Sequence, residues 1–176
     1  MDRRGYLTGI ATTAALGLAG CGGSGSAEVG DSVTRSGMEA AVQDTQTVAE
    51  IDGEVQGSNH AATDGTTILM AKLRVRNGAN ERRVAPWPRS DLTYLRYNDS
   101  NRQTLYLSDS FTADGSEYAS WNSALVENTD GDYILPGEEA TGWEAFSLES
   151  AYTDADVAVV IELDTGGETN AAEWQI

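Results

Sequence analysis

The chain has 176 residues, of which 28 are Asp or Glu and 11 are Lys or Arg, giving a formal net charge of −17. This length suits one ordinary domain with a short leader, and the single cysteine, Cys21, excludes an intrachain disulfide. So acidic a chain repels nucleic acid and anionic lipid headgroups, and neither is an expected partner.

Residues 1–20 are predicted to be a signal peptide. The pair Arg3-Arg4 is followed by an uncharged stretch that ends at Gly20 and is shorter than the roughly 20 residues a membrane span needs. The pair resembles the twin-arginine export signal, and Leu18-Ala19-Gly20-Cys21 resembles the lipobox that precedes a lipidated cysteine. We therefore expect Arg3 and Arg4 to direct export, and Cys21 to carry the lipid that holds the protein on the outer face of the cell membrane.

Residues 21–30 are predicted to be a tether, and residues 31–176 the folded domain. Gly22 to Gly30 is rich in glycine and serine and lacks periodicity, which is typical of a flexible linker. Loss of Asp2, Arg3 and Arg4 with the signal peptide would change the net charge from −17 to −18.

From Asp31 onward the alternation of apolar and polar residues predicts strands, and no helix of ten residues is indicated. The clearest strand is 66–76, with apolar side chains at 69, 71, 73 and 75 facing one way and Lys72, Arg74 and Arg76 the other. Residues 98–102 favour a tight turn and predict a hairpin. The other expected strands are 32–35, 40–51, 92–97, 103–107, 123–126, 139–148, 157–163 and 174–176.

Seven to nine short strands with turn signals between them predict an all-β fold, an immunoglobulin-like antiparallel β-sandwich. Three segments of the chain also resemble a known family. They are Gly30-Asp31-Ser32-Val33, Val75-Arg76-Asn77-Gly78, and Leu135-Pro136-Gly137-Glu138 leading to Gly142-Trp143. This family comprises the telokin-like, immunoglobulin-fold domains of bacterial and archaeal lipoproteins, whose function is unknown. The resemblance implies the sandwich and the surface location, and it carries no catalytic residues.

Few residues suggest chemistry, and we expect no catalytic residue, metal site or cofactor. His60 is the only histidine and lies in a polar loop, so it cannot build a multi-histidine zinc site. Glu127-Asn128-Thr129-Asp130-Gly131-Asp132 gathers oxygen ligands around a glycine, as calcium loops do, but lacks their full spacing. It is read as either an acidic turn or a calcium site.

Three further features have two interpretations each. The basic residues Lys72, Arg74 and Arg76 could hold an anion, or pair with acids on neighbouring strands. Trp87 in Pro86-Trp87-Pro88 is either an exposed partner contact or a plug at one end of the sandwich. Asn98 begins the only N-x-S/T sequon, in the expected hairpin turn, and is a possible glycosylation site.

These features predict a non-enzymatic, membrane-anchored module that binds or protects something at the cell surface, with an unidentified protein or small molecule as partner. The alternative is a hydrolase that acts on envelope polymer through paired carboxylates. The dense acidic charge, with Lys72 as the only lysine, resembles the proteins of salt-loving archaea, so we also expect adaptation to high salt.

Overall fold

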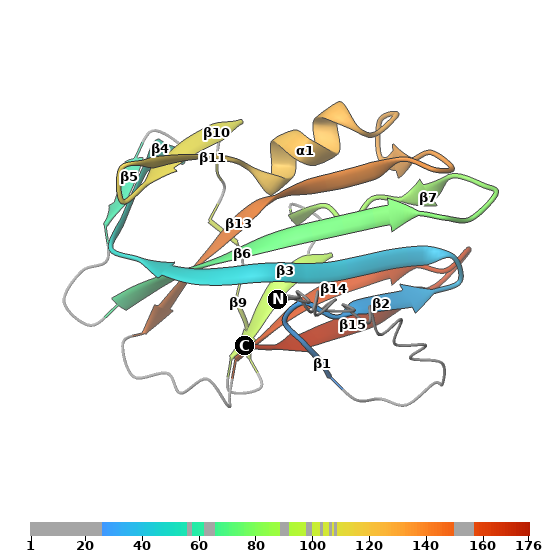
Figure 1. Cartoon of the computed structure of the whole chain (residues 1–176), viewed down its shortest axis with the longest axis horizontal. Coiled ribbons are helices and arrows are strands. Elements are labelled where there is room, and N and C mark those ends of the chain that lie inside the picture. Colours follow the sequence, from blue (N-terminus) through green and yellow to red (C-terminus); the bar gives the residue numbers. More distant parts are fainter. Residues whose placement is uncertain are drawn as a thin grey trace, which may run out of the picture.

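The computed structural model describes residues 26–55, 58–61, 66–88, 92–97, 100–102, 104–105, 107, 109–149 and 157–176. These residues form a β-sandwich with one short helix, which confirms the predicted all-β class (Figure 1). The strands run from β1 to β15, more than the seven to nine expected, because many are edge strands of two to four residues. In the described part of the chain, no helix has the length and apolar character needed to cross a membrane.

Two sheets face each other across the main core. The long sheet has the order β13-β6-β3-β2, and the short sheet has the order β1-β15-β14-β8-β9. The long sheet consists of β2 (Ser32–Arg35), β3 (Met38–Val48), β6 (Thr66–Asn77) and β13 (Glu139–Glu149). The short sheet consists of β1 (Ala27–Glu28), β8 (Thr93–Tyr97), β9 (Ser100–Arg102), β14 (Val157–Asp164) and β15 (Thr169–Gln175).

The main core lies between the inner faces of these two sheets. Leu69, Leu73 and Val75 of β6 are buried there, as the alternation predicted, and Val159 and Ile161 of β14 face them. Burying such side chains contributes about 1.5–3 kcal/mol each. The prediction that Lys72, Arg74 and Arg76 lie on the opposite face of this strand is also confirmed by its register.

The outer face of β14 is buried as well. Ala158 and Val160 point away from the main core, yet they are only 3% and 1% exposed. Arg96 on β8 pairs with Glu173 on β15, so their long side chains cross over β14 from both neighbouring strands. The aliphatic stems of charged side chains thus shield apolar residues that alternation alone would place in water.

A small sheet of order β11-β10-β4-β5 covers the other half of the long strands with a second core (Figure 1). It contains β4 (Glu50–Val55), β5 (Ser58–Ala61), β10 (Ser110–Ala113) and β11 (Ser116–Ala119). Ile68 and Met70 of β6 face this second core with Phe111 of β10. The expected strand 40–51 is therefore divided at Ala49, where the chain leaves the long sheet for the small one.

The division at Ala49 is stabilised from a hairpin far along the sequence. The Asp114 carboxylate accepts hydrogen bonds from the backbone N–H groups of Ala49, at 3.1 Å, and Glu50, at 3.3 Å. Asp114 and Gly115 have φ of 45° and 80°, as the turn between β10 and β11 requires, and aspartate is one of the few side chains that tolerate this region.

The strand expected at 123–126 is wrong, because these residues lie in helix α1 (Trp121–Glu127). The Ser120 side chain caps the helix by accepting a hydrogen bond from the Ser123 N–H at 3.0 Å. Trp121, Ala124 and Leu125 are buried, a spacing of three and four residues that places them on one helical face. Periodicity over only seven residues is too short to separate helix from strand.

The folded part begins earlier than residue 31, the predicted start of the domain. Ala27 and Glu28 form β1, which pairs in parallel with Trp174 and Gln175 of β15. The Trp174 indole N–H also donates to the backbone oxygen of Asp31 at 2.9 Å. The folded part therefore begins by Ala27, and residues 174–176, expected to form a closing edge, lie beside β1 rather than at the sheet edge.

A hairpin occurs near the predicted place, but its second strand, β9, lies within residues 98–102, which were predicted to be the turn. β8 pairs with β9, so that Tyr97 opposes Ser100. Leu105, which was expected in the second strand of the hairpin, pairs with the long sheet instead: its N–H donates to the Ala145 oxygen of β13 at 2.7 Å. The two strands not yet described, β7 (Arg83–Val84) and β12 (Tyr133–Ile134), pair with each other and form a separate two-stranded sheet.

Candidate functional site

Most of the predicted site residues lie outside the described part of the chain. This holds for Arg3, Arg4, Cys21 and Asn98. Trp87 is described and is only 3% exposed, packed in the main core. The structure therefore supports its role as a plug and contradicts its role as a partner contact, because a partner cannot reach the indole.

The acidic segment 127–132 forms the end of α1 and a tight turn. Asp130 and Tyr133 exchange backbone hydrogen bonds of 2.9 and 3.3 Å, and Gly131 between them has φ of 64°. Three or more His, Cys, Asp or Glu side chains placed to share a metal ion occur nowhere in the described residues. His60 lies in β5, where its backbone pairs with Ile51.

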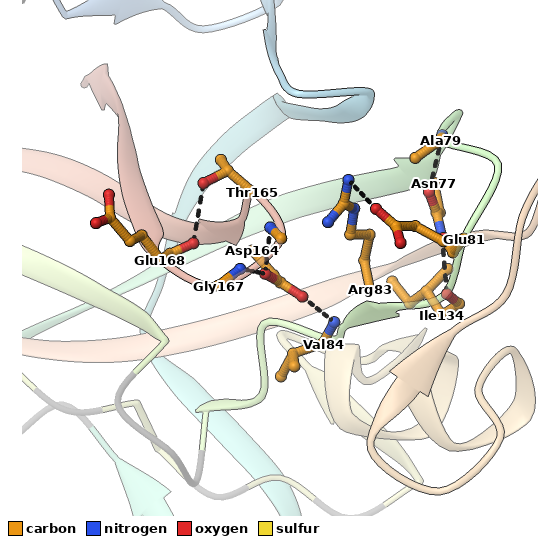
Figure 2. A network of polar contacts seen from close by, with 11 residues as sticks. Asn77, Ala79, Glu81, Arg83, Val84, Ile134, Asp164, Thr165, Gly167 and Glu168 are labelled. Atoms are coloured by element: carbon orange, nitrogen blue, oxygen red, sulfur yellow. Dashed lines mark hydrogen bonds and ion pairs between the residues drawn. The ribbon is translucent and has the colours of Figure 1, made fainter.

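One end of the sandwich, here called the loop end, carries a network centred on Arg83 and Asp164 (Figure 2). The Arg83 side chain is 8% exposed, and its Nη2 lies 3.0 Å from Glu81. On the other side it borders Gly166, where a Cβ atom would lie 2.4 Å from its Nη1. A buried guanidinium thus fills the space between the turn after β14 and the loop before β7.

Asp164 accepts hydrogen bonds from three backbone N–H groups in the same network. They come from Val84 at 2.9 Å, Gly166 at 2.8 Å and Gly167 at 3.4 Å (Figure 2). Burial alone would raise the pKa of Asp164, but these hydrogen bonds and the Arg83 charge lower it. Through these hydrogen bonds the carboxylate connects β7 to the β14–β15 turn, so we assign this network a structural role.

A second acidic group lies between the sheets. Glu144 on β13 is 3% exposed, and one of its oxygens accepts a hydrogen bond of 3.2 Å from the adjacent Ala145 N–H. Burial raises the pKa of this carboxyl well above its ordinary value. Its inward position follows from the register, because it shares a face with the core residues Ala140 and Phe146.

The outer face of the long sheet carries the candidate binding site. In register across β13, β6 and β3 lie Trp143, Lys72 and Asp44, here called the outer row. Trp143 is partly buried against the second core, and Tyr118 meets it edge to face with ring centroids 5.3 Å apart. The row thus combines an aromatic ring, an ammonium group and a carboxylate on one rigid surface.

A β-bulge shapes the row. The register between β3 and β6 shifts between Val42 and Asp44, which leaves Gln43 as the extra residue and places Asp44 opposite Lys72. The Asp44 Oδ1 accepts a hydrogen bond of 2.9 Å from the Thr45 N–H. Bulges often occur where a sheet redirects a side chain towards a ligand.

Lys72 and Arg74 lie on the same face of β6, as predicted, but they have different surroundings. The Arg74 guanidinium lies 2.7 Å from a Glu39 oxygen and 2.9 Å from a Glu139 oxygen. Arg74 therefore pairs with acids on both neighbouring strands, which is one of the two interpretations of the basic residues drawn from the sequence. The hydrogen bond to Glu139 is the main cause of the raised pKa of Arg74. Within the described residues, Lys72 has no such ion-pair partner.

The outer row is not evident from the sequence. A signal existed, since Lys72 is the only lysine, but its neighbours depend on the pairing of three strands and on a bulge that no local pattern reveals. Trp143 and Asp44 are 71 and 28 residues away along the chain.

Comparisons with known proteins support the fold. No protein-family model and no curated protein matches the chain. The crystal structure of the yjhA protein from Bacillus subtilis is similar, with a TM-score of 0.53 and 11% identity over 84% of this chain and 97% of that one. A functionally unknown protein from Listeria monocytogenes EGD-e gives a TM-score of 0.50 and 8% identity, covering 86% of this chain and 83% of that one.

A third similar structure, from Bacillus subtilis strain 168, is described as a presumptive lipoprotein (ycdA). It has a TM-score of 0.52 and 12% identity over 85% of this chain, and this chain spans 38% of its length. At such low identity the likeness concerns the fold alone: the chain is similar to bacterial proteins in its β-sandwich architecture.

Proposed function

We propose that this protein is an extracytoplasmic lipoprotein, anchored in the cell membrane through Cys21, whose β-sandwich is a non-enzymatic binding module. The observation that carries the proposal is the order Arg3-Arg4, uncharged stretch, Leu18-Ala19-Gly20-Cys21, placed directly before a folded domain. The fold shared with a presumptive lipoprotein supports it.

The early start of the fold gives the anchor a geometric consequence. Five residues, 22–26, separate Cys21 from β1, and fully extended they reach at most about 18 Å. The tether would therefore hold the sandwich close to the membrane surface. The lipid makes this possible without contacts between the sandwich and anionic headgroups, which the negative charge of the protein would oppose.

The test replaces Cys21 with serine in the exporting cell. The unchanged protein should partition with membranes and have the mass of a chain that begins at Cys21 plus lipid, whereas the Cys21→Ser protein should carry no lipid. A wild-type chain with an unmodified Cys21 would overturn the proposal.

Exchange of both Arg3 and Arg4 for lysine keeps the charge and should leave precursor in the cytoplasm, if a receptor recognises the arginine pair.

A further inference from the structure

Two residues that are rare in this chain meet in the outer row. Lys72 is the only lysine among 11 basic residues. Of the four tryptophans, Trp87, Trp121 and Trp174 are at most 3% exposed, whereas Trp143 reaches the surface. These two side chains lie directly opposite each other on adjacent antiparallel strands, where Cβ atoms are about 4.5–5.5 Å apart.

The surroundings hold the row rigid on both sides. Towards the loop end, Arg74 bridges Glu39 and Glu139 and so fixes the long sheet's outer face. In the other direction, Met70 belongs to the second core and receives a hydrogen bond from Gln46 at 3.8 Å. The edge-to-face contact with Tyr118 orients the Trp143 ring. A binding surface built on strands and packed in this way loses little freedom when it is occupied.

The chemistry of the row matches a sugar ring. A pyranose has an apolar face, which suits the part of the Trp143 indole that remains exposed, and a rim of hydroxyl groups that both donate and accept hydrogen bonds. The Lys72 ammonium offers three donors and the Asp44 carboxylate only acceptors, so together they satisfy both kinds of hydroxyl contact. Since the ammonium and the carboxylate cancel in charge, the row favours a neutral ligand.

We propose that the outer row, Trp143, Lys72 and Asp44, binds a neutral saccharide. This deepens the proposed function by naming the ligand class of the binding module, and rests on it. The Trp143 ring stacks on the sugar, Lys72 and Asp44 bind its hydroxyls, and the short tether places the row close to the glycans of the cell surface.

The experiment titrates the full chain carrying Cys21→Ser, in molar KCl, with soluble oligosaccharides of glucose, galactose and mannose. Binding is followed by calorimetry and by tryptophan fluorescence, in which Trp143 is the surface reporter. We expect saturable binding by at least one oligosaccharide. Trp143→Ala should weaken it by about tenfold or more, and Lys72→Ala by about three- to tenfold.

Two controls keep the result interpretable. Lys72 is half-buried and bears no ion pair within the described residues, so Lys72→Ala should fold normally even if Trp143→Ala disturbs the second core. Tyr94→Phe, on the outer face of the short sheet, should leave binding unchanged. Absence of binding to every oligosaccharide, or wild-type affinity in both row variants, would overturn the inference. A wild-type chain found without lipid on Cys21, with sugar binding intact in the Cys21→Ser protein, would overturn the anchor alone.

Discussion

Glu144 holds a carboxyl group in the middle of an apolar core. Its pKa is raised because burial opposes ionisation more strongly than the single backbone hydrogen bond favours it. The native chain therefore keeps its proton at pH values where the unfolded chain has already lost it. By linkage, stability then falls as pH rises through the unfolded value of 4.5 and continues to fall until the raised native pKa is reached.

We predict that Glu144→Met stabilises the fold at neutral pH. Methionine has a similar size and brings no charge into the core, so the gain should be about 1–3 kcal/mol at pH 8 and should shrink towards pH 4. Denaturant unfolding of both proteins across this range measures the difference. Glu117→Gln, at an exposed site, is the matched control and should give a small effect. A difference independent of pH would contradict ionisation of Glu144 as the cause.

At the scale of elements, α1 depends on a glycine in β13. The backbone of Ser120 and Trp121 lies so close to Gly142 that a Cβ atom there would be 2.6 Å from the Ser120 oxygen and 2.8 Å from the Trp121 Cα. These are backbone atoms, and Trp121, the first residue of the helix, is fully buried. The helix can pack at this distance only because the strand has no side chain at this position.

Gly142→Ala is therefore expected to displace α1 and cost about 2–4 kcal/mol, as overpacking in a core does at its upper range. Gly137→Ala is the control: it has open space around it and only an unfavourable φ of 87°, so it should cost about 1 kcal/mol. Thermal unfolding compares the two variants, and hydrogen exchange at residues 121–127 reports on the helix. Equal costs at both glycines would exclude the close approach as the cause.

The elements also show what a local pattern can predict. β6 and β13 were predicted to within one residue, because their alternation is long and one face is buried throughout. The β10–β11 hairpin was missed although Asp114-Gly115 is a strong turn signal. The burial of Ala158 and Val160 could not have been predicted, because it depends on side chains from the two neighbouring strands.

At the scale of the whole molecule, the N-terminal anchor is predicted by motifs in fixed order, whereas the proposed binding surface is a product of the fold. The charge belongs to this scale too. The net charge of −17, which the proposed cleavage would change to −18, opposes compaction through repulsion, whose range is about 30 Å in 0.01 M salt and about 3 Å in 1 M salt.

We predict that the thermal midpoint of the chain carrying Cys21→Ser rises steeply between dilute buffer and molar KCl, because salt screens this repulsion and favours apolar burial. Circular dichroism melts measure the midpoint. In a variant with the exposed Glu117, Glu127, Glu138 and Glu168 changed to Gln, the rise should be smaller, since less charge remains to be screened. A midpoint that stays flat in salt would show that the acidic surface has another cause.

The single lysine has a further consequence for chemical labelling. Reagents that acylate amines find only one side-chain amine in this molecule, at Lys72, and otherwise the amino terminus. The nucleophile sits on the outer face of β6, beside the one tryptophan that reaches the surface. A cross-linker attached to Lys72 starts from a known position in the middle of the long sheet. Any molecule that it captures must therefore have approached that position to within the length of the spacer.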